Sequence, residues 1–328
     1  MLENMKLSII VTVYNKEPFL RRCLDSCLNQ KGVSAGDYEL VIINDGSTDG
    51  SLSIISEYAD KYGNIIVLDQ SNAGLSIARN NGIDISTGDY LWFVDADDWV
   101  SPDSVRTILT AAGSLPDVIP IYAGMEGSDK VQNLIPTDAN SGRDILLSGM
   151  WEKSSQLYVL RNDYLKGNDL RFFPRIYHED CEFTPRMLSM AKTATVIDKV
   201  LYVTCCDPNS ITQVPKIKRS YDILLIIEHI FHFVEVHNFD DKLTQAIDYG
   251  MSVTLNSALL NIICFDSKEI KKFNHAMYDY RKYFVCLKNA KAKNKLEYLL
   301  FQLFPKHYVG VYKAMKFYHL RTLLKKSI

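Results

Sequence analysis

Apolar runs and amphipathic segments alternate along the first 100 residues of the chain. Continuous apolar, β-branched runs are typical of strands buried on both faces of a sheet. The run at residues 7–13 is of this kind, and further apolar runs predict strands at residues 38–43, 65–68 and 90–94. The segments between them predict helices at residues 18–30 and 50–62, and a third helix that opens at residues 72–74. The order of these elements is therefore strand, helix, strand.

This alternation predicts a mostly parallel sheet with right-handed crossovers and helices on both faces. In such sheets a ligand lies beyond the carboxyl ends of the strands. Polar clusters follow three of the predicted strands, at Tyr14-Asn15, Asp45-Gly46-Ser47 and Asp95-Ala96-Asp97. All three strand ends therefore indicate the same site.

Beyond Pro102 the pattern loosens but still predicts elements. It indicates a helix to about residue 112, a strand at 118–122, a surface hairpin or loop at 124–142, a strand at 151–161, a helix at 182–190 and a strand at 194–203. From about residue 215 the chain is expected to be helical. The prediction is an α/β domain over residues 1–214 and a helical region over residues 215–328.

The composition is that of a folded protein, with 47% hydrophobic and 23% charged residues among 328. The amino terminus lacks the features of a secretory signal, and no uncharged apolar stretch reaches the ~18 residues of a membrane span. The seven cysteines form no CxxC pair, which favours reduced, packed thiols. We therefore expect a cytoplasmic protein.

Charge is distributed unevenly along the chain. From Asp266 onward there are 15 Lys/Arg and 4 Asp/Glu, a net charge of +11, which leaves −13 for the preceding residues. Helices that mix basic and aromatic residues can lie on an anionic membrane surface. The alternative is a helical subdomain that packs on the catalytic domain or on a second subunit. No nucleic-acid-binding motif accompanies the basic residues.

Asp95-Ala96-Asp97 is the first candidate for chemistry. Two carboxylates separated by one residue suit a hard divalent cation that bridges the oxygens of a diphosphate. The alternative is a polar turn in which an aspartate, Asp98 for example, caps the following helix. The position at the end of a predicted parallel strand favours the cation site.

Several ordered segments resemble the family 2 glycosyltransferases with the GT-A fold. They are SIIVTVYNKEPFLRRCLDSCLNQ, VIINDGSTDGS, NAGLSIARNNGIDISTGDYLWFVDADDW, FFPRIYHEDCEF and LYVTCCDPNSIT, and they cover residues from about 5 to 212. The resemblance implies a transferase that moves a sugar, such as a hexose or an N-acetylhexosamine, from a nucleotide diphosphate to an acceptor hydroxyl. It also implies Mn²⁺ or Mg²⁺ as cofactor and a role in cell-surface polysaccharide synthesis.

The resemblance further implies roles for individual residues of the first domain. Thr12 and Tyr14 would line the base, with the tyrosine stacking on it. Asp45 would accept the N3–H of uracil, although Asp-Gly-Ser is also a strong turn sequence on its own. Arg79 would contact the nucleotide or its phosphates. In the same scheme Asp95 holds the ribose or the sugar, and Asp97 holds the metal.

His178-Glu179-Asp180 is the second candidate centre. The resemblance implies that Asp180 is the general base, which takes the proton of the acceptor hydroxyl in a single displacement with inversion at the anomeric carbon. Glu179 would bind the acceptor or the donor sugar. Two acidic residues at a helix start are also favoured simply by the helix dipole.

One departure from the resembling family falls late in the catalytic domain. Thr204-Cys205-Cys206-Asp207 replaces an Arg-rich stretch, while Asn209-Ser210-Ile211-Thr212 follows the family pattern. The missing basic partner of the diphosphate is then expected from elsewhere, such as Lys216, Lys218 or Arg219.

There are three alternatives to the transferase. A nucleotidyltransferase of similar fold would carry a Gly-rich loop after the first strand, and a dehydrogenase would carry GxGxxG; the chain has neither. An inactive sugar-nucleotide-binding or scaffolding subunit is the third, and Asp95, Asp97 and Asp180 argue against it.

Overall fold

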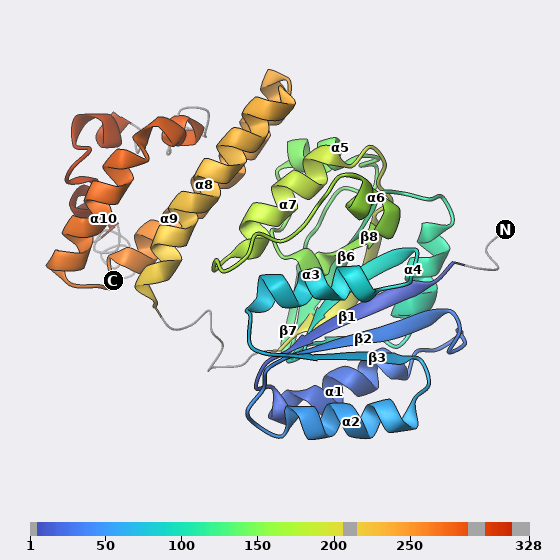
Figure 1. Ribbon diagram of the computed structural model, residues 1–328. Helices are drawn as coiled ribbons and strands as arrows, with labels where there is room; N and C mark the ends of the chain where they lie inside the picture. The colour runs from blue at the N-terminus through green and yellow to red at the C-terminus, as the bar shows by residue number, and fades with distance from the viewer. Residues whose placement is uncertain (1–4, 206–214, 288–298, 317–328) are drawn as a thin grey trace, which may run out of the picture. The chain divides into compact units, whose positions relative to one another are not determined.

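The computed structural model describes residues 5–205, 215–287 and 299–316, and the chain divides into two compact units. The first unit comprises Met1–Arg175 and Phe183–Pro208, and the second comprises Ile176–Glu182 and Asn209–Ile328. Figure 1 shows a sheet with flanking helices in the first unit and helices in the second. A short segment before residue 183 therefore belongs to the helical unit, although the chain around it belongs to the first unit.

The described part of the first unit contains a nine-stranded sheet. Its strands are β1 (Leu7–Val13), β2 (Tyr38–Asp45), β3 (Ile65–Gln70), β4 (Tyr90–Asp95), β5 (Trp99–Val100), β6 (Val118–Met125), β7 (Ser128–Gln132), β8 (Tyr158–Arg161) and β9 (Ile197–Thr204). Their spatial order is β3-β2-β1-β4-β8-β6-β9-β5, and β7 pairs with β6. The four strands from β3 to β4 are parallel, β8 is antiparallel to both of its neighbours, and β6 and β9 are parallel. The predicted parallel arrangement is confirmed for β1 to β4. The sheet as a whole is mixed, because β5 and β7 are also antiparallel to their partners β9 and β6.

The helices of this unit follow the predicted alternation. They are α1 (Glu17–Leu28), α2 (Ser51–Lys61), α3 (Leu75–Ile85), α4 (Ser104–Ala112), α5 (Gly142–Ser148), α6 (Asn162–Gly167) and α7 (Glu179–Met190), whose first turn lies in the second unit. In Figure 1, α1 and α2 lie on one side of strands β1 to β3 and α3 lies on the other.

Strand β1 forms the centre of the core because its apolar run is buried on both faces. Leu7, Ile9, Ile10 and Val11 have no exposed surface, and β1 pairs with β2 on one side and β4 on the other. Helix α3 approaches this strand closely: a Cβ on Gly82 would lie 2.5 Å from Cγ2 of Ile10. A helical glycine here therefore sets the distance between helix and sheet.

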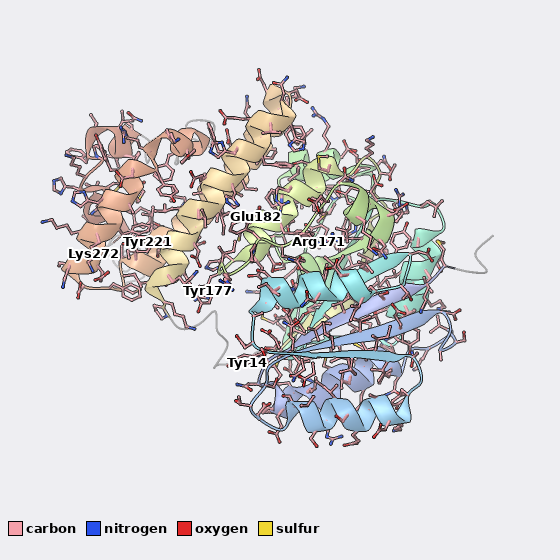
Figure 2. The ribbon with its side chains drawn as sticks, viewed as in Figure 1. Tyr14, Arg171, Tyr177, Glu182, Tyr221 and Lys272 are labelled. Atoms are coloured by element: carbon pink, nitrogen blue, oxygen red, sulfur yellow. The ribbon has the colours of Figure 1, made fainter. Side chains whose placement is uncertain are left out.

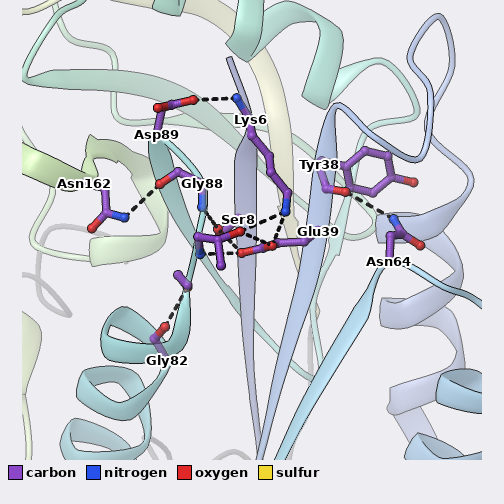
Figure 3. A network of polar contacts seen from close by, with 11 residues as sticks. Lys6, Ser8, Tyr38, Glu39, Asn64, Gly82, Gly88, Asp89 and Asn162 are labelled. Carbon is purple, nitrogen blue, oxygen red and sulfur yellow. Dashed lines mark hydrogen bonds and ion pairs between the residues drawn. The ribbon is translucent and has the colours of Figure 1, made fainter. Parts of the chain in front are cut away.

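A polar network fastens the amino ends of β1 and β2 to the chain that enters β4 (Figure 3). The buried Glu39 carboxylate accepts hydrogen bonds from Ser8 Oγ at 2.7 Å, from the Thr87 amide at 2.7 Å and from Thr87 Oγ1 at 2.6 Å, and it pairs with Lys6. Burial alone would raise the pKa of Glu39, but these donors outweigh it and hold the pKa at about 2. Glu39 is therefore a buried anion whose charge is compensated at several points.

The loosely patterned middle of the chain differs from the prediction in one place. A strand was expected over residues 151–161, but only Tyr158–Arg161 is extended, and Ser155–Leu157 forms a 3₁₀ turn (η1). All three side chains of this turn are buried, a pattern that a strand with one exposed face cannot give. The predicted hairpin at 124–142 is confirmed in part by the antiparallel pair β6 and β7.

The second unit is helical in its described residues, as the sequence predicts. It contains α8 (Ile217–His237), α9 (Asp241–Ile262), α10 (Ser267–Asp279) and the 3₁₀ segment η2 (Arg281–Leu287). The side chains of Asp240 and Asp266 cap the first turns of α9 and α10. Among the helices of residues 5–205, 215–287 and 299–316, none has both the length and the apolarity to cross a bilayer.

Part of the sequence evidence lies outside the described residues. This applies to Cys206-Asp207, to Asn209-Ser210-Ile211-Thr212 and to the basic residues beyond 316. The five cysteines whose state the structure gives are free thiols: Cys23, Cys27, Cys181, Cys205 and Cys264.

Candidate active site

The carboxyl ends of β1, β2 and β4 meet at one edge of the sheet. In the strand register Thr12 lies opposite Ile43 of β2 on one side and opposite Asp95 of β4 on the other. Asp45 ends β2 two residues beyond Ile43, and Tyr14 follows β1 directly. The predicted convergence of these three strand ends is confirmed.

Tyr14 presents an open aromatic surface at this edge. Its side chain is 46% exposed, whereas Thr12 at the end of the strand is half-buried. Figure 2 labels Tyr14 where the strands converge. An exposed ring at this place offers a face on which a planar base can stack.

The loops that follow β1 and β2 are fastened to each other. Asn15 donates its amide to Ser47 Oγ at 3.1 Å, and its side-chain oxygen accepts the Thr48 amide at 2.7 Å. The Glu17 carboxylate accepts the Gly50 amide at 2.8 Å, and a Cβ on Gly50 would lie 2.5 Å from that carboxylate. The two loops therefore form one connected surface at the edge of the sheet.

Asp45 anchors the chain that leads into α3. Its carboxylate accepts the amides of Ala73 at 2.7 Å and Gly74 at 2.9 Å and the Gln70 side-chain amide at 2.8 Å. The residue is only 4% exposed. A carboxylate has about four lone-pair sites. These three contacts therefore leave about one site for a further donor.

Arg79 and Asp95 form an ion pair in which the guanidinium is buried and the carboxylate is partly exposed. Arg79 is 1% exposed, and its Nη2 lies 3.0 Å from Oδ1 of Asp95. The guanidinium carbon lies 5.1 Å from the centre of the Phe172 ring, within the range of a cation–π contact. The second oxygen of Asp95 accepts the side-chain amide of Gln156, which comes from the turn before β8.

Asp97 has a different partner. Its carboxylate pairs with the ammonium group of Lys16, and the two side chains are 19% and 22% exposed. Arg22 contacts only the main chain here, donating to the Asp97 carbonyl oxygen at 3.2 Å. The guanidinium of Arg22 lies 3.9 Å from the centre of the Trp99 ring and 3.0 Å from Glu126.

Asp98 does not cap the following helix, contrary to the alternative considered for it. Helix α4 has Asp103 at its N-cap, whereas the buried Asp98 carboxylate accepts the Tyr202 hydroxyl at 2.5 Å and the Cys205 amide at 2.7 Å. Burial and the charge of Asp95 raise the pKa of Asp98 to about 7. Because the Tyr202 hydroxyl also accepts the Asp95 amide at 3.2 Å, β9 holds the Asp95–Asp98 turn in place.

The acidic residues of this edge fit a divalent cation only together with a bound diphosphate. Among the residues that the structure describes, no group of three or more His, Cys, Asp or Glu is placed to hold a metal ion. Mg²⁺ at nucleotide sites is commonly bound by one or two carboxylates, with phosphate oxygens and water as the other ligands. The partly exposed Asp97 carboxylate is a hard oxygen donor of this kind.

Glu179 and Asp180 lie in the second unit, in the first turn of α7. Glu179 is buried and Asp180 is half-buried, and His178 before them has a left-handed φ of 63°. The Tyr177 amide donates to Asp222 Oδ2 of α8 at 2.8 Å, which ties this segment to the helical unit. The role of Asp180 as general base stays a prediction.

Basic residues gather around Tyr177, which is labelled in Figure 2. Lys216 Nζ, Lys218 Nζ and the Arg219 guanidinium carbon lie 5.3, 5.5 and 5.7 Å from the centre of its ring. These are the cations that the sequence indicates as substitutes for the missing Arg-rich stretch. The structure groups them within the second unit.

Sequence reasoning missed three partners of the carboxylates: Lys16, Gln156 and Tyr202. Lys16 directly follows Tyr14-Asn15, the polar cluster after the first predicted strand. A cation at this position could have indicated a partner for one of the carboxylates. Gln156 comes from the turn before β8 and Tyr202 comes from β9, and no local pattern indicates how these segments pair.

Comparison with known proteins identifies the family. A model of glycosyl transferase family 2 matches residues 8–189, more than half of the chain, and the chain belongs to this family. The glycosyltransferase YibD of Escherichia coli K12 is 35% identical over 213 residues, which cover 60% of this chain and 60% of YibD. The chain thus matches less than two thirds of that relative's length.

Solved structures share the fold. The crystal structure of S. aureus TarS 1-349 in complex with UDP-GlcNAc gives a TM-score of 0.78 at 20% identity and covers 95% of this chain and 92% of that one. The mannosyltransferase PcManGT of Pyrobaculum calidifontis, in complex with GDP-Man and Mn²⁺, gives a TM-score of 0.51 at 15% identity, with 89% and 86% covered. The fold of this chain is GT-A, followed by a helical region.

Proposed function

We propose that this chain is an inverting glycosyltransferase that moves a sugar from a UDP-linked donor to the hydroxyl of a cell-surface glycan. The observation that carries the proposal is the arrangement at one sheet edge of an exposed aromatic ring, Tyr14, and the carboxylates of Asp45, Asp95 and Asp97. Family 2 membership supports the reaction class.

The uridine would bind at Tyr14, Thr12 and Asp45. The open ring of Tyr14 suits stacking on the base, and Thr12 borders it at the end of β1. Asp45 has about one lone-pair site beyond its three contacts, which suits the N3–H of uracil. The UDP-GlcNAc complex of TarS, a protein of the same fold, supports uracil as the base.

The phosphates and sugar would lie next to Arg79, Asp95 and Asp97. Asp95 would hold ribose or sugar hydroxyls, and the buried Arg79 guanidinium orients Asp95 through their ion pair. Arg79 would contact a phosphate oxygen through a charge-assisted hydrogen bond. Asp97 would hold Mn²⁺ or Mg²⁺, and the metal supplies charge neutralisation for the leaving diphosphate. PcManGT, bound to Mn²⁺, supports this cofactor.

Asp180 would act as the general base and Glu179 would bind the acceptor or the donor sugar. The acceptor oxygen attacks the anomeric carbon while the bond from that carbon to the phosphate oxygen breaks, and the acceptor proton passes to the Asp180 carboxylate. A single displacement of this kind inverts the anomeric configuration.

We place the reaction at the cytoplasmic face of a membrane, with a glycan or a lipid-linked glycan as acceptor. The basic, aromatic residues after Asp266 support contact with an anionic surface. A second subunit is the other partner that this region would suit.

The proposal is tested by donor binding and transfer in matched variants. Asp180→Asn should bind UDP-sugar with unchanged affinity in calorimetry yet lose transfer by about 100-fold or more, because a positioned base contributes that factor. Asp97→Ala should weaken both metal-dependent donor binding and transfer.

The same assay separates an enzyme from an inactive sugar-nucleotide-binding subunit. With manganese and a panel of nucleotide sugars, an enzyme releases nucleotide diphosphate and the Asp97→Ala variant does not. Undetectable release from every donor, or undiminished transfer by Asp180→Asn, would contradict the proposed roles.

A further inference from the structure

Lys16 places a cation on the carboxylate to which the proposed function assigns the metal. The Lys16 ammonium and the Asp97 carboxylate are in direct contact, and about four fifths of each side chain is buried. Water screens such a pair less than a fully exposed one. The contact therefore compensates much of the Asp97 charge when no metal is bound.

The main chain of Lys16 is held firmly, so this contact does not depend on a loose surface loop. The Lys16 amide donates to Ser51 Oγ at 3.0 Å at the start of α2. The next amide, that of Glu17, donates to Asp49 Oδ2 at 3.0 Å. These bonds fix the residue from which the ammonium reaches Asp97.

Among the described residues, Lys16 is the side-chain cation that pairs with the Asp97 carboxylate. Arg22 is the nearest alternative, but its guanidinium stacks on Trp99 and pairs with Glu126. Within residues 5–205, 215–287 and 299–316, Lys16 is the ion-pair partner that the structure gives to the Asp97 carboxylate.

We propose that Lys16 is a built-in competitor of the divalent cation. Its ammonium neutralises Asp97 in the nucleotide-free protein and is displaced when the metal arrives, because two cations repel each other at one carboxylate. The donor diphosphate brings new anionic oxygens, and the released ammonium pairs with them. Metal binding is thus weak without nucleotide and strong with it. The inference rests on the assignment of Asp97 as metal ligand.

The test is titration of the full-length protein with Mn²⁺, followed by the electron paramagnetic resonance signal of the free ion. Without nucleotide, Lys16→Met should bind Mn²⁺ about five-fold more tightly than wild type, the factor for losing one ion pair of about 1 kcal/mol. Lys16→Arg keeps the charge and should bind like wild type. Lys61→Met, on the exposed end of α2, is the matched control and should also leave binding unchanged.

The titration is repeated with saturating UDP. UDP should increase Mn²⁺ affinity more in wild type than in Lys16→Met, because the methionine variant has no ammonium to transfer to the diphosphate. Equal or weaker Mn²⁺ binding by Lys16→Met without UDP, including the case in which neither protein binds detectably, would overturn the inference.

An Asp97→Asn variant separates this failure from failure of the proposed function. If Asp97→Asn binds Mn²⁺ as wild type does, Asp97 is not the metal ligand and the proposed metal site fails. If Asp97→Asn loses Mn²⁺ while Lys16→Met behaves as wild type, only the role of Lys16 fails.

Discussion

The carboxylates at the sheet edge differ in what compensates their charge. Asp45 is held by main-chain amides, Asp95 by a buried guanidinium and Asp97 by a partly exposed ammonium. Amides and a buried arginine are fixed by the fold, whereas a lysine ammonium on a flexible stem can move. Of the three, Asp97 is the carboxylate that can most readily exchange its partner for a ligand.

Individual residues on the opposite edge of the sheet are expected to govern stability. Glu39→Gln removes the buried anion. The pKa of Glu39 is about 2 in the folded protein against an ordinary 4.5, and this difference corresponds to about 3 kcal/mol. We therefore expect the free energy of unfolding at pH 7 to fall by about that amount. Since the folded pKa is the lower one, this stabilisation is present above pH 4.5 and is lost as the pH falls through 2. In urea denaturation, the difference in the free energy of unfolding between wild type and Glu39→Gln should therefore be roughly half as large at pH 3 as at pH 7.

Glu57→Gln serves as the comparison for that experiment. Glu57 pairs with Arg21 on the surface, and both side chains are more than half exposed. Its replacement should change stability little at either pH. A Glu39→Gln difference that is the same at both pH values would contradict the assignment of Glu39 as a low-pKa buried anion.

At the scale of elements, packing of α3 against β1 depends on one glycine. In Gly82→Ala the new Cβ would lie 2.5 Å from Ile10, so helix or strand must shift, and we expect a loss of about 1–3 kcal/mol. Gly167→Ala is the matched helical control, because nothing lies within 4 Å of its Cβ, and it should be neutral or stabilising by up to about 1 kcal/mol. Thermal unfolding of both variants measures the difference, and equal melting temperatures would show that the contact is relieved without cost.

Strands β1 to β4 were predictable from sequence because they are parallel and mostly apolar. Strands β1, β2 and β4 are central and buried, whereas β3 is an edge strand that is only partly buried. Strand β1 was predicted at its observed bounds, and β2, β3 and β4 each continue one or two residues beyond the prediction. Strands buried on both faces read as continuous apolar runs, which little else in the chain imitates. The two residues of β5 are too few for any periodic pattern, and the 3₁₀ turn before β8 is buried through tertiary contacts alone.

The same distinction applies to the candidate site. Asp45, Asp95 and Asp97 could be placed together because they end or follow parallel strands, a relation that sequence order carries. Their partners Gln156 and Tyr202 could not, because the positions of the turn before β8 and of β9 follow from long-range packing. The order of strands in the sequence predicts which carboxylates lie at the same edge of the sheet. It does not predict which side chains donate hydrogen bonds to each carboxylate.

For the whole molecule, the charge imbalance leads to a prediction about membranes. Leu303 and Phe304 are 60% and 47% exposed close to Lys306 in the second unit. We expect the full-length protein to sediment with phosphatidylglycerol vesicles but not with phosphatidylcholine vesicles, and to be released by 0.5 M salt, a concentration chosen to screen surface charge strongly. Lys306→Ala should weaken this binding by about five-fold, the factor expected for one basic residue near the surface.

Two results would contradict that prediction. Equal sedimentation with both lipids would indicate that charge plays no part. Absence from both pellets would favour the other explanation, in which the basic helices contact a second subunit.

The fastening of the two loops behind Tyr14 has a thermodynamic consequence. Asn15, Glu17, Ser47, Thr48 and Gly50 are already joined by hydrogen bonds before any ligand arrives. A nucleotide that binds to this surface does not have to order either loop, so little conformational entropy is lost on binding. Calorimetry of uridine binding should then show little loss of conformational entropy from these two loops. Slow hydrogen exchange of the Thr48 and Gly50 amides should already be visible in the protein without nucleotide.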